Sequence, residues 1–494
     1  MHDPDAFDTI GSPSPPSARH TALTLTRPTL RPTLRPTLRE DWVADVAADH
    51  KRRREVANLG AAEAALESMQ SWILVSGVGI AVGLLAACID IVAAWLTDVK
   101  LGYCESEWYL PRDSCCTVVS CPRWKDWSNA FFGPDIYFIN WMFYILLSTS
   151  FAAAVAVIVV MIAPNAAGSG TAEVKTILGG FIIKDFLDAK TLLVKSIALP
   201  LTVASGLAVG KEGPMIHVAS CLGSILPDFF PKYRFNEGRK REILSAAAAS
   251  GVAVAFGAPI GGVLFSLEEI SSFFPAKTML RSFFCALVSC VTLQLIDPYR
   301  GKRVLIEVTV SRDWQFFETG AFLVLGVFGG LTGAFVIKMS TYVQQIRKKS
   351  WLRLYPMLEV ICLAALTAFV GFINPFTRID SSELLEALFK ECEESDFNGM
   401  CQAKNRGWTI AQLIMALAFR LGLTIVSLGI KVPAGIFIPS MVWGALFGRL
   451  VGLWMQSFQQ AWPELPIFSS CRPDIPCVTP GMYALLGAIA SLGE

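Results

Sequence analysis

The sequence predicts an all-α membrane protein, and three observations lead to this fold class. Of its 494 residues, 53% are hydrophobic and 17% are charged, whereas soluble domains are about 45–50% apolar and about 25% charged. Two segments, Trp72 to Leu96 (interrupted only by Asp90) and Ile136 to Ala163, exceed the roughly 20 apolar residues that span a bilayer. Later apolar segments are broken by glycine and proline, which a membrane tolerates only where the helices line a cavity or lie inside protein. A water-soluble protein is therefore not expected.

The charges of the sequence are balanced. The 42 Lys and Arg residues and the 41 Asp and Glu residues leave a formal net charge of +1. Because there is no basic excess to attract a polyanion, we expect no nucleic-acid partner.

Residues 1–70 are expected to form a disordered, basic tail in the cytosol. They contain three tandem copies of Arg-Pro-Thr-Leu between residues 27 and 38, and such dense proline denies a helix its amide hydrogens. A docking motif or a mitochondrial presequence are the alternatives, but Asp3, Asp5 and Asp8 argue against a presequence. The basic residues from Lys51 to Arg54 precede the first span and place the N-terminus in the cytosol.

Residues 71–494 are expected to form one membrane domain. After the first two spans the apolar segments become shorter or interrupted, which suggests a transport pathway. These further candidates are Leu192 to Val209, Ile243 to Leu267, Ser282 to Ile296, Phe316 to Ile337, Met357 to Ile373, Ile410 to Leu428 and Phe437 to Leu453.

Eight of the 13 cysteines lie in polar loops that the order of crossings places away from the cytosol. Disulfides persist in such an oxidising compartment. A metal site at residues 115, 116 and 121 is the alternative, but no histidine is near and the CxxC spacing is absent. We therefore expect disulfides, of open connectivity, among Cys104, Cys115, Cys116, Cys121, Cys392, Cys401, Cys471 and Cys477.

The first of four glycine-punctuated stretches, residues 168–173, reads Gly-Ser-Gly-Thr-Ala-Glu and opens a helical pattern. Ser169 between Gly168 and Gly170 would offer a hydroxyl beside the free amides of a helix N-terminus, which suits an anion. An ordinary loop is the alternative.

The second stretch, residues 206–214, superficially resembles a phosphate-binding loop. One residue too few separates Gly206 from Gly210, and Glu212 stands where a hydroxyl would hold magnesium, so an ATPase is not expected. The Glu212 carboxylate could instead occupy the anion site of the helix that Pro214 begins, and leave it on protonation. A helix cap or a salt bridge to Lys211 is the alternative.

The third stretch runs from Gly257 through a Gly/Pro break to an apolar helix that ends in Glu268 and Glu269. Adjacent residues on a helix point about 100° apart, so we expect one acid to face solvent and the other a buried route. A solvated helix end is the alternative.

The fourth stretch, Lys431 to Pro439, is a Gly/Pro-framed turn before another apolar helix. Free backbone amides at its start would point inward. A simple turn between two spans is the alternative.

Together the four stretches resemble the CLC family of chloride channels and chloride/proton exchangers, most closely its eukaryotic intracellular branch. The motifs GSGxxE, GKEGP, GVLFSLEE and GIFIP occur in the family's order, and the resemblance extends from about Asp41 to the C-terminus. It implies inverted repeats of broken, tilted helices and a homodimer. Where nitrate-selective plant relatives have proline, this chain has Ser169, which implies chloride as the transported ligand.

The resemblance also implies roles for single residues. Ser169 would coordinate a central chloride, Glu212 would be the gating glutamate that competes with chloride, and Glu269 would be the internal proton-transfer residue. The remaining residues that match chloride-binding positions are Gly168, Gly170, Gly435, Ile436 and Phe437, and those that support the motif are Gly210, Lys211, Gly213 and Pro214.

Two departures from the family pattern matter. Thr171 and Ala172 replace a common Ile-Pro pair, which should alter the turn only mildly. The chain also ends at Glu494 within an apolar segment, so the membrane domain is expected to be incomplete at its C-terminus and to fold poorly alone. The family's coordinating tyrosine and cytoplasmic CBS domains are not found, and Tyr483 lies in a different context from that tyrosine.

The first functional interpretation is proton-coupled chloride antiport across an endosome, Golgi or vacuole membrane, with chloride, protons and lipid as partners. A gated passive chloride channel is the second, and a truncated, non-functional fragment is a distant one. A membrane enzyme or receptor is also distant, because the histidines are only His2, His20, His50 and His217 and no metal-ligand cluster appears. We expect neither a metal nor another cofactor, and His217 should be a helix-packing residue.

Overall fold

The computed structural model describes residues 51, 54, 60–105, 107–116, 124–131, 133, 136–234, 236–271, 276–296, 314–390, 406–468 and 477–492, a few of them by backbone alone. All belong to one compact unit, Arg39–Glu494. Most of the predicted disordered tail, residues 1–70, lies outside the described residues, but its last ten residues already belong to the first long helix.

The chain enters the fold through two long apolar helices, as predicted. These are α2 (Ala61–Val99) and α5 (Tyr137–Met161). Neither helix has one apolar and one polar face, because hydrophobic residues surround most of each helix, which is typical of a helix surrounded by lipid and protein. Between them lie β1 (Gly102–Cys104), α3 (Arg112–Cys115), β2 (Trp124–Asp126) and α4 (Trp127–Phe131). The antiparallel pair β1 and β2 is the only sheet among the described residues.

The next group of helices is short and interrupted. Its members are η1 (Pro164–Ala166), α6 (Thr171–Leu178), α7 (Ala189–Ala204), α8 (Glu212–Ile225), η2 (Leu226–Phe229), α9 (Pro231–Arg234), α10 (Glu237–Phe256), α11 (Pro259–Phe265), η3 (Ser266–Ile270) and α12 (Ala276–Ile296). With 8, 16 and 14 residues, α6, α7 and α8 are shorter than the roughly 20 residues of a full span. Gly170, Gly206 and Gly257 adopt positive φ at breaks, where another residue would be strained.

The last group again alternates long and short helices. It comprises η5 (Phe316–Glu318), α13 (Thr319–Lys349), η6 (Trp351–Arg353), α14 (Pro356–Gly371), α15 (Pro375–Arg378), α16 (Ser381–Phe389), α17 (Arg406–Ser427), α18 (Phe437–Ala461), η8 (Pro466–Phe468) and α19 (Pro480–Ala490).

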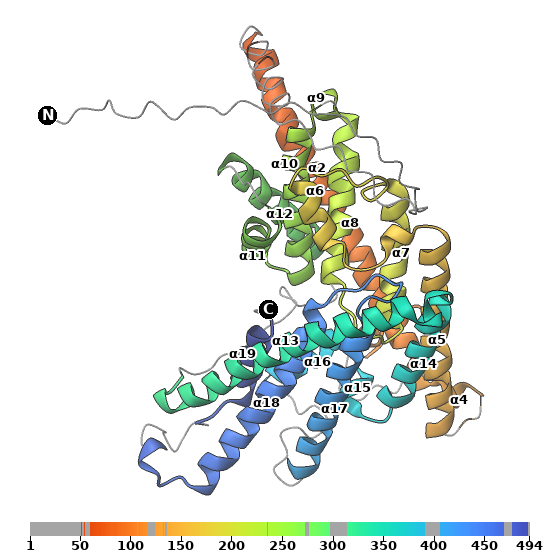
Figure 1. Ribbon diagram of the computed structural model, residues 1–494, viewed down its shortest axis with the longest axis vertical. Coiled ribbons are helices and arrows are strands. Elements are labelled where there is room, and N and C mark those ends of the chain that lie inside the picture. The colour runs from red at the N-terminus through yellow and green to blue at the C-terminus, as the bar shows by residue number, and fades with distance from the viewer. Residues whose placement is uncertain are drawn as a thin grey trace, which may run out of the picture. The chain divides into compact units, whose positions relative to one another are not determined.

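Small residues let neighbouring helices approach closely. Helix α10 packs on α8, α2 and α12, as Figure 1 shows in green and orange. A side chain added at Gly223 of α8 would overlap with Ala247 of α10, and α18 and α19 meet in the same way at Gly448 and Gly487. This close packing places the ends of broken helices inside protein, where their backbone groups are shielded from lipid.

Six helices among the described residues are long and apolar enough to cross a membrane. They confirm the two predicted full-length spans and support an all-α membrane fold. They are Met69–Val99, Tyr137–Met161, Thr278–Ile296, Phe316–Lys349, Arg406–Ser427 and Phe437–Ala461.

The predicted span Ile243 to Leu267 is wrong as a single helix. Helix α10 ends at Phe256, Gly257 has φ 67°, and a new helix begins at Pro259. Proline has no amide hydrogen for a continued ladder and suits a first helical turn. The predicted span Leu192 to Val209 likewise ends early, at Ala204.

Candidate anion-binding site

A pair of backbone hydrogen bonds joins the second and fourth glycine-rich stretches. The Gly210 amide donates to the Gly435 carbonyl at 2.8 Å, and the Gly435 amide donates to the Gly210 carbonyl at 2.9 Å. A Cβ at Gly435 would lie 2.9 Å from the Gly210 oxygen, closer than side chains tolerate. The starts of α8 and α18 are therefore held together by backbone atoms.

The first stretch meets the second at Ser169. A Cβ added at Gly213 would overlap with Ser169 Oγ, so the serine hydroxyl lies directly over the first turn of α8. Ser169 Oγ is also 2.9 Å from Thr171 Oγ1. The GSG loop, residues 168–170, is held at its start by the Gly168 amide, which donates to the Val432 carbonyl at 2.9 Å.

Three helix starts thus converge where the sequence predicts an anion. Helices α6, α8 and α18 begin at Thr171, Glu212 and Phe437. The first amides of a helix have no acceptor within it, and they carry the positive end of its dipole. An arrangement of several such ends beside a serine hydroxyl can replace the water around an anion.

Glu212 is the buried acid at this junction. Its side chain is 1% exposed, and neither carboxyl oxygen has a hydrogen-bond partner among the described residues. Lys211 pairs with Asp90 of α2 rather than with Glu212, and the structure records no side-chain cap at this helix start. Both alternatives to a functional interpretation, the salt bridge and the cap, are therefore wrong.

One aromatic contact and one ion pair connect the third stretch to helices α18 and α6. The ring of Phe437, at the start of α18, packs edge-on against Phe265, with 5.6 Å between the ring centroids. Glu269 forms an ion pair with Lys175 of α6 at 2.9 Å, and these side chains are 61% and 53% exposed.

The prediction that one of the two acids faces the interior is wrong, because Glu268 and Glu269 are both exposed. They lie in η3, a π-helical turn. Ser266 and Ile270 at the two ends of this turn are buried and the helix ends at Ile270, so the two acids lie at an exposed helix end, which was the alternative.

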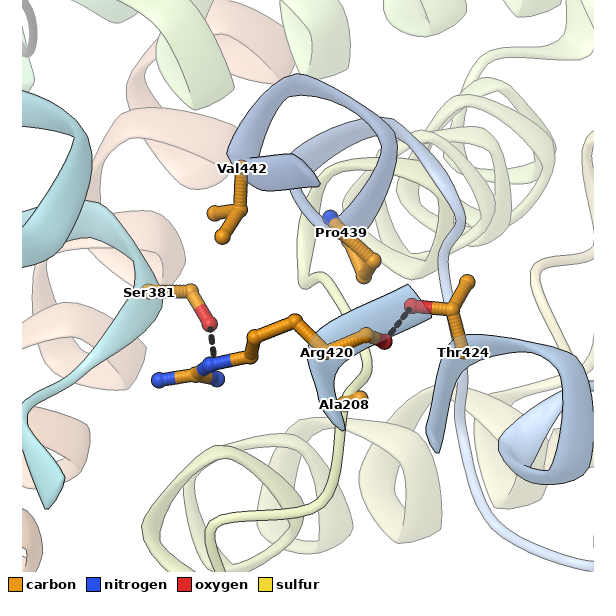
Figure 2. Close-up of a pocket in the computed structure, with 6 residues that line it drawn as sticks. All are labelled: Ala208, Ser381, Arg420, Thr424, Pro439 and Val442. Atoms are coloured by element: carbon orange, nitrogen blue, oxygen red, sulfur yellow. Dashed lines mark hydrogen bonds between the residues drawn. The ribbon is translucent and has the colours of Figure 1, made fainter. Parts of the chain in front are cut away.

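A small pocket lies next to the junction and contains a buried arginine. Figure 2 shows Arg420 of α17 reaching toward Ser381, with Pro439 and Val442 of α18 on one side and Ala208 on the other. Arg420 is 6% exposed and donates to Ser381 Oγ at 3.1 Å and to the Thr377 and Ile379 carbonyls at 3.2 and 3.0 Å. Its Nε atom has no partner among the described residues.

Sequence reasoning missed Arg420 as well as Lys195, a second buried cation. Each is a single charge inside a predicted apolar span. That isolation is itself a signal, because an ionisable residue at membrane depth usually has a function.

Comparison with known proteins identifies the family. A sequence model described as "Voltage gated chloride channel" matches residues 151–494. The chain belongs to this family.

Curated relatives of this chain include exchangers. Human "H(+)/Cl(-) exchange transporter 3" is 43% identical over 494 aligned positions, which cover 92% of this chain and 60% of the relative. Human "H(+)/Cl(-) exchange transporter 5" is 41% identical over 492 positions, with the same coverage. The chain thus spans about 60% of the length of these relatives.

Two solved structures share the fold. A "eukaryotic CLC transporter" matches with a TM-score of 0.62 and 22% identity, over 86% of this chain and 65% of that one. A "slow cyanobacterial Cl-/H+ antiporter" matches with a TM-score of 0.62 and 18% identity, over 85% of this chain and 89% of that one. These matches show the CLC fold, in accord with the predicted class.

The cysteine-bearing loops of this CLC-family chain contain disulfides. Cys104 of β1 forms a disulfide with Cys115 of α3. Cys116 takes part in a disulfide, and so does Cys477. The predicted cysteines 121, 392, 401 and 471 lie outside the described residues. Within the part of the chain that is described, no group of three or more His, Cys, Asp or Glu residues could hold a metal ion.

Proposed function

We propose that this chain transports chloride across a membrane in exchange for protons. The observation that carries the proposal is the buried, unpartnered Glu212 carboxyl group at the junction of three helix starts. Burying an ionised carboxylate without hydrogen bonds is costly. The positive ends of the three helices can offset this cost for one negative charge at a time. That charge would alternately be the carboxylate and a chloride ion. The exchangers among the relatives support the same assignment.

Glu212 would act as the gate. As a carboxylate it competes with chloride for the positive ends of α8 and α18, and as a neutral acid it has little reason to stay there. The hydroxyl of Ser169, the amides of Ile436 and Phe437 and the backbone of Gly168 and Gly170 would hold the central chloride. Gly210, Lys211, Gly213 and Pro214 would keep Glu212 in place. Proton arrival and chloride entry are then linked at one position, and no covalent bond is made or broken.

Glu269 would pass protons to this gate from the cytosolic side. Its exposed carboxyl group can exchange protons with water, and Lys175, its partner, lies on α6, which begins at the GSG loop. An exposed ion pair of this kind is weak, so it would not prevent Glu269 from accepting a proton.

The wider setting is proposed with the activity. We place the protein as a homodimer in an endosome, Golgi or vacuole membrane with its N-terminus in the cytosol. The basic segment from Lys51 to Arg54 supports that orientation through the positive-inside rule. The disulfides suit loops on the opposite, oxidising side.

Liposomes that contain the purified protein test the proposal. A chloride gradient should drive protons uphill, Glu212→Ala should conduct chloride without moving protons, and Glu269→Ala should lose the coupling as well. Glu268→Ala is the matched control, since this neighbouring acid is also exposed, and its coupling should remain. Chloride flux without uphill proton movement in the unmodified protein would indicate the second candidate, a passive channel. Retained coupling in Glu212→Ala would rule out its role as the gate.

A further inference from the structure

A buried lysine and histidine lie behind the GSG loop. Lys195 of α7 is 1% exposed and His217 of α8 is 0% exposed. The Lys195 Nζ atom is 2.9 Å from the Gly168 carbonyl oxygen, 3.2 Å from the Ser169 carbonyl oxygen and 2.8 Å from His217 Nδ1. The pair thus contacts the backbone of the serine that is expected to hold the anion.

The hydrogen bonds determine the form of the histidine. Nε2 of His217 is 3.0 Å from the Phe186 carbonyl oxygen, which can only accept, so Nε2 must carry a hydrogen. Nδ1 faces an ammonium group, which can only donate, so Nδ1 must be the acceptor. The network therefore assigns the neutral tautomer with its hydrogen on Nε2.

This tautomer completes the bonding of Lys195. An ammonium group has three donors, and here they go to two carbonyls and one ring nitrogen. No carboxylate of the described residues forms an ion pair with it, and Glu173 of α6 interacts with it only at longer range. A buried charge is tolerable only when its hydrogen bonds are made, and His217 supplies one of the three.

The two carbonyl contacts also orient the loop. The chain has no cis peptide bond among its described residues, and a trans peptide points its carbonyl and the following amide in opposite directions. The amides of Ser169 and Gly170 therefore point away from Lys195. Gly170 has φ 83°, and a Cβ at this position would overlap with the His217 ring, so loop and ring fit each other without spare space.

We propose that Lys195 and His217 are positioning residues of the anion site. His217 fixes the ammonium group of Lys195, and Lys195 fixes the GSG loop and adds a positive charge behind Ser169. This assignment rests on the proposed function. The predicted packing role of His217 is part of its task, because its ring stacks on that of Phe186 with 4.1 Å between the ring centroids. The hydrogen bond from Lys195 adds the positioning role.

Substitutions at residue 217 separate positioning from packing. His217→Leu removes both hydrogen bonds, whereas His217→Gln can accept from Lys195 and donate to the Phe186 carbonyl. The readouts are the chloride dissociation constant of the purified protein, from titration calorimetry, and the ratio of nitrate to chloride flux in liposomes. Ser220→Ala is the matched control, because Ser220 is also fully buried on α8 and its hydroxyl has no partner among the described residues.

We expect His217→Leu to weaken chloride binding about tenfold, the equivalent of one hydrogen bond to a charged group, and to change the flux ratio. The chloride dissociation constants of His217→Gln and Ser220→Ala should stay within about twofold of that of the unmodified protein. Lys195→Met should weaken binding at least as much as His217→Leu. The double variant should be no worse than Lys195→Met alone, because His217 acts through Lys195.

If His217→Leu does not fold, His217→Phe provides the same test, because its ring keeps the stack on Phe186. Leu or Phe variants that fold and keep chloride affinity and flux ratio would overturn the inference. So would an equal loss in His217→Gln, which would mean that ring packing alone matters. An unmodified protein that neither binds nor conducts chloride would instead overturn the proposed function, and the inference with it.

Discussion

The two glutamates expected to move protons lie in opposite environments. Glu212 is 1% exposed and has no hydrogen-bond partner among the described residues, whereas the Glu269 side chain is 61% exposed and paired with Lys175. Water can stabilise the charge of Glu269 whether or not its partner is present. The helix ends and the neighbouring Lys211 can stabilise the charge of Glu212, and an anion competes for the same helix ends. The contrast explains how one acid could gate while the other supplies protons.

The same contrast holds for the two lysines beside these acids. Lys211 directly precedes Glu212 in the sequence, and its side chain and that of its partner Asp90 are each about 10% exposed. The side chains of Lys175 and Glu269 are both more than half exposed. Buried and exposed ion pairs differ strongly in what their loss costs. Asp90→Ala and Lys175→Ala test this difference, and Gly170→Ala adds the tight fit of the GSG loop to the comparison. The free energy of unfolding is followed by detergent titration of the purified protein.

Asp90→Ala should have the largest effect. It leaves the Lys211 ammonium group buried without its partner, and the expected loss is about 3–5 kcal/mol. The double variant Asp90→Leu with Lys211→Leu is the control, and it should recover part of that stability because no charge remains buried. A loss below about 1 kcal/mol for Asp90→Ala would mean that the pair behaves as a surface pair.

Gly170→Ala should have an intermediate effect. The left-handed conformation costs a non-glycine residue about 1–2 kcal/mol, and the new methyl group would overlap with the His217 ring. We expect a loss of about 2–4 kcal/mol from strain and overpacking together, and weaker chloride binding. Gly320→Ala is the control, because a Cβ there would meet nothing within 4 Å. Equal stabilities of the two variants would contradict the tight fit at Gly170.

Lys175→Ala should have the smallest effect. Both members of its pair are more than half exposed, so we expect a loss below about 1 kcal/mol. Glu269 would then lack its partner but remain in contact with water, and proton coupling should persist. A large loss of stability would show that this region is covered in the assembled protein, for example by a second copy of the chain.

The sequence was most informative where local chemistry decides the structure. Continuous apolar runs predicted α2 and α5, and glycine and proline marked the starts of α6, α8 and α18. For residues 243–267 two patterns disagreed. Hydropathy continued as one span, whereas Gly257 and the proline at 259 indicated a break, and the structure has the break. Glu268 and Glu269 are both exposed in a π-helical turn that no local pattern indicated.

Long-range contacts account for the rest. The partners of Lys195 include the Gly168 carbonyl, 27 residues away, and Arg420 binds Ser381, 39 residues away. Averaging over an apolar window hides one charge among many hydrophobic residues, and only the folded chain shows how that charge is satisfied.

The hydrogen-bonded bridge between Gly210 and Gly435 constrains how fast and by what motion ions could cross. A cycle that separated the two segments would have to break both backbone bonds at every turnover, and rearrangements of whole domains take about microseconds to milliseconds. Rotation of one carboxyl-bearing side chain breaks neither bond and moves only a few atoms. A protein built in this way can keep its scaffold rigid, so the supply of protons and ions, rather than a change of shape, would set its pace.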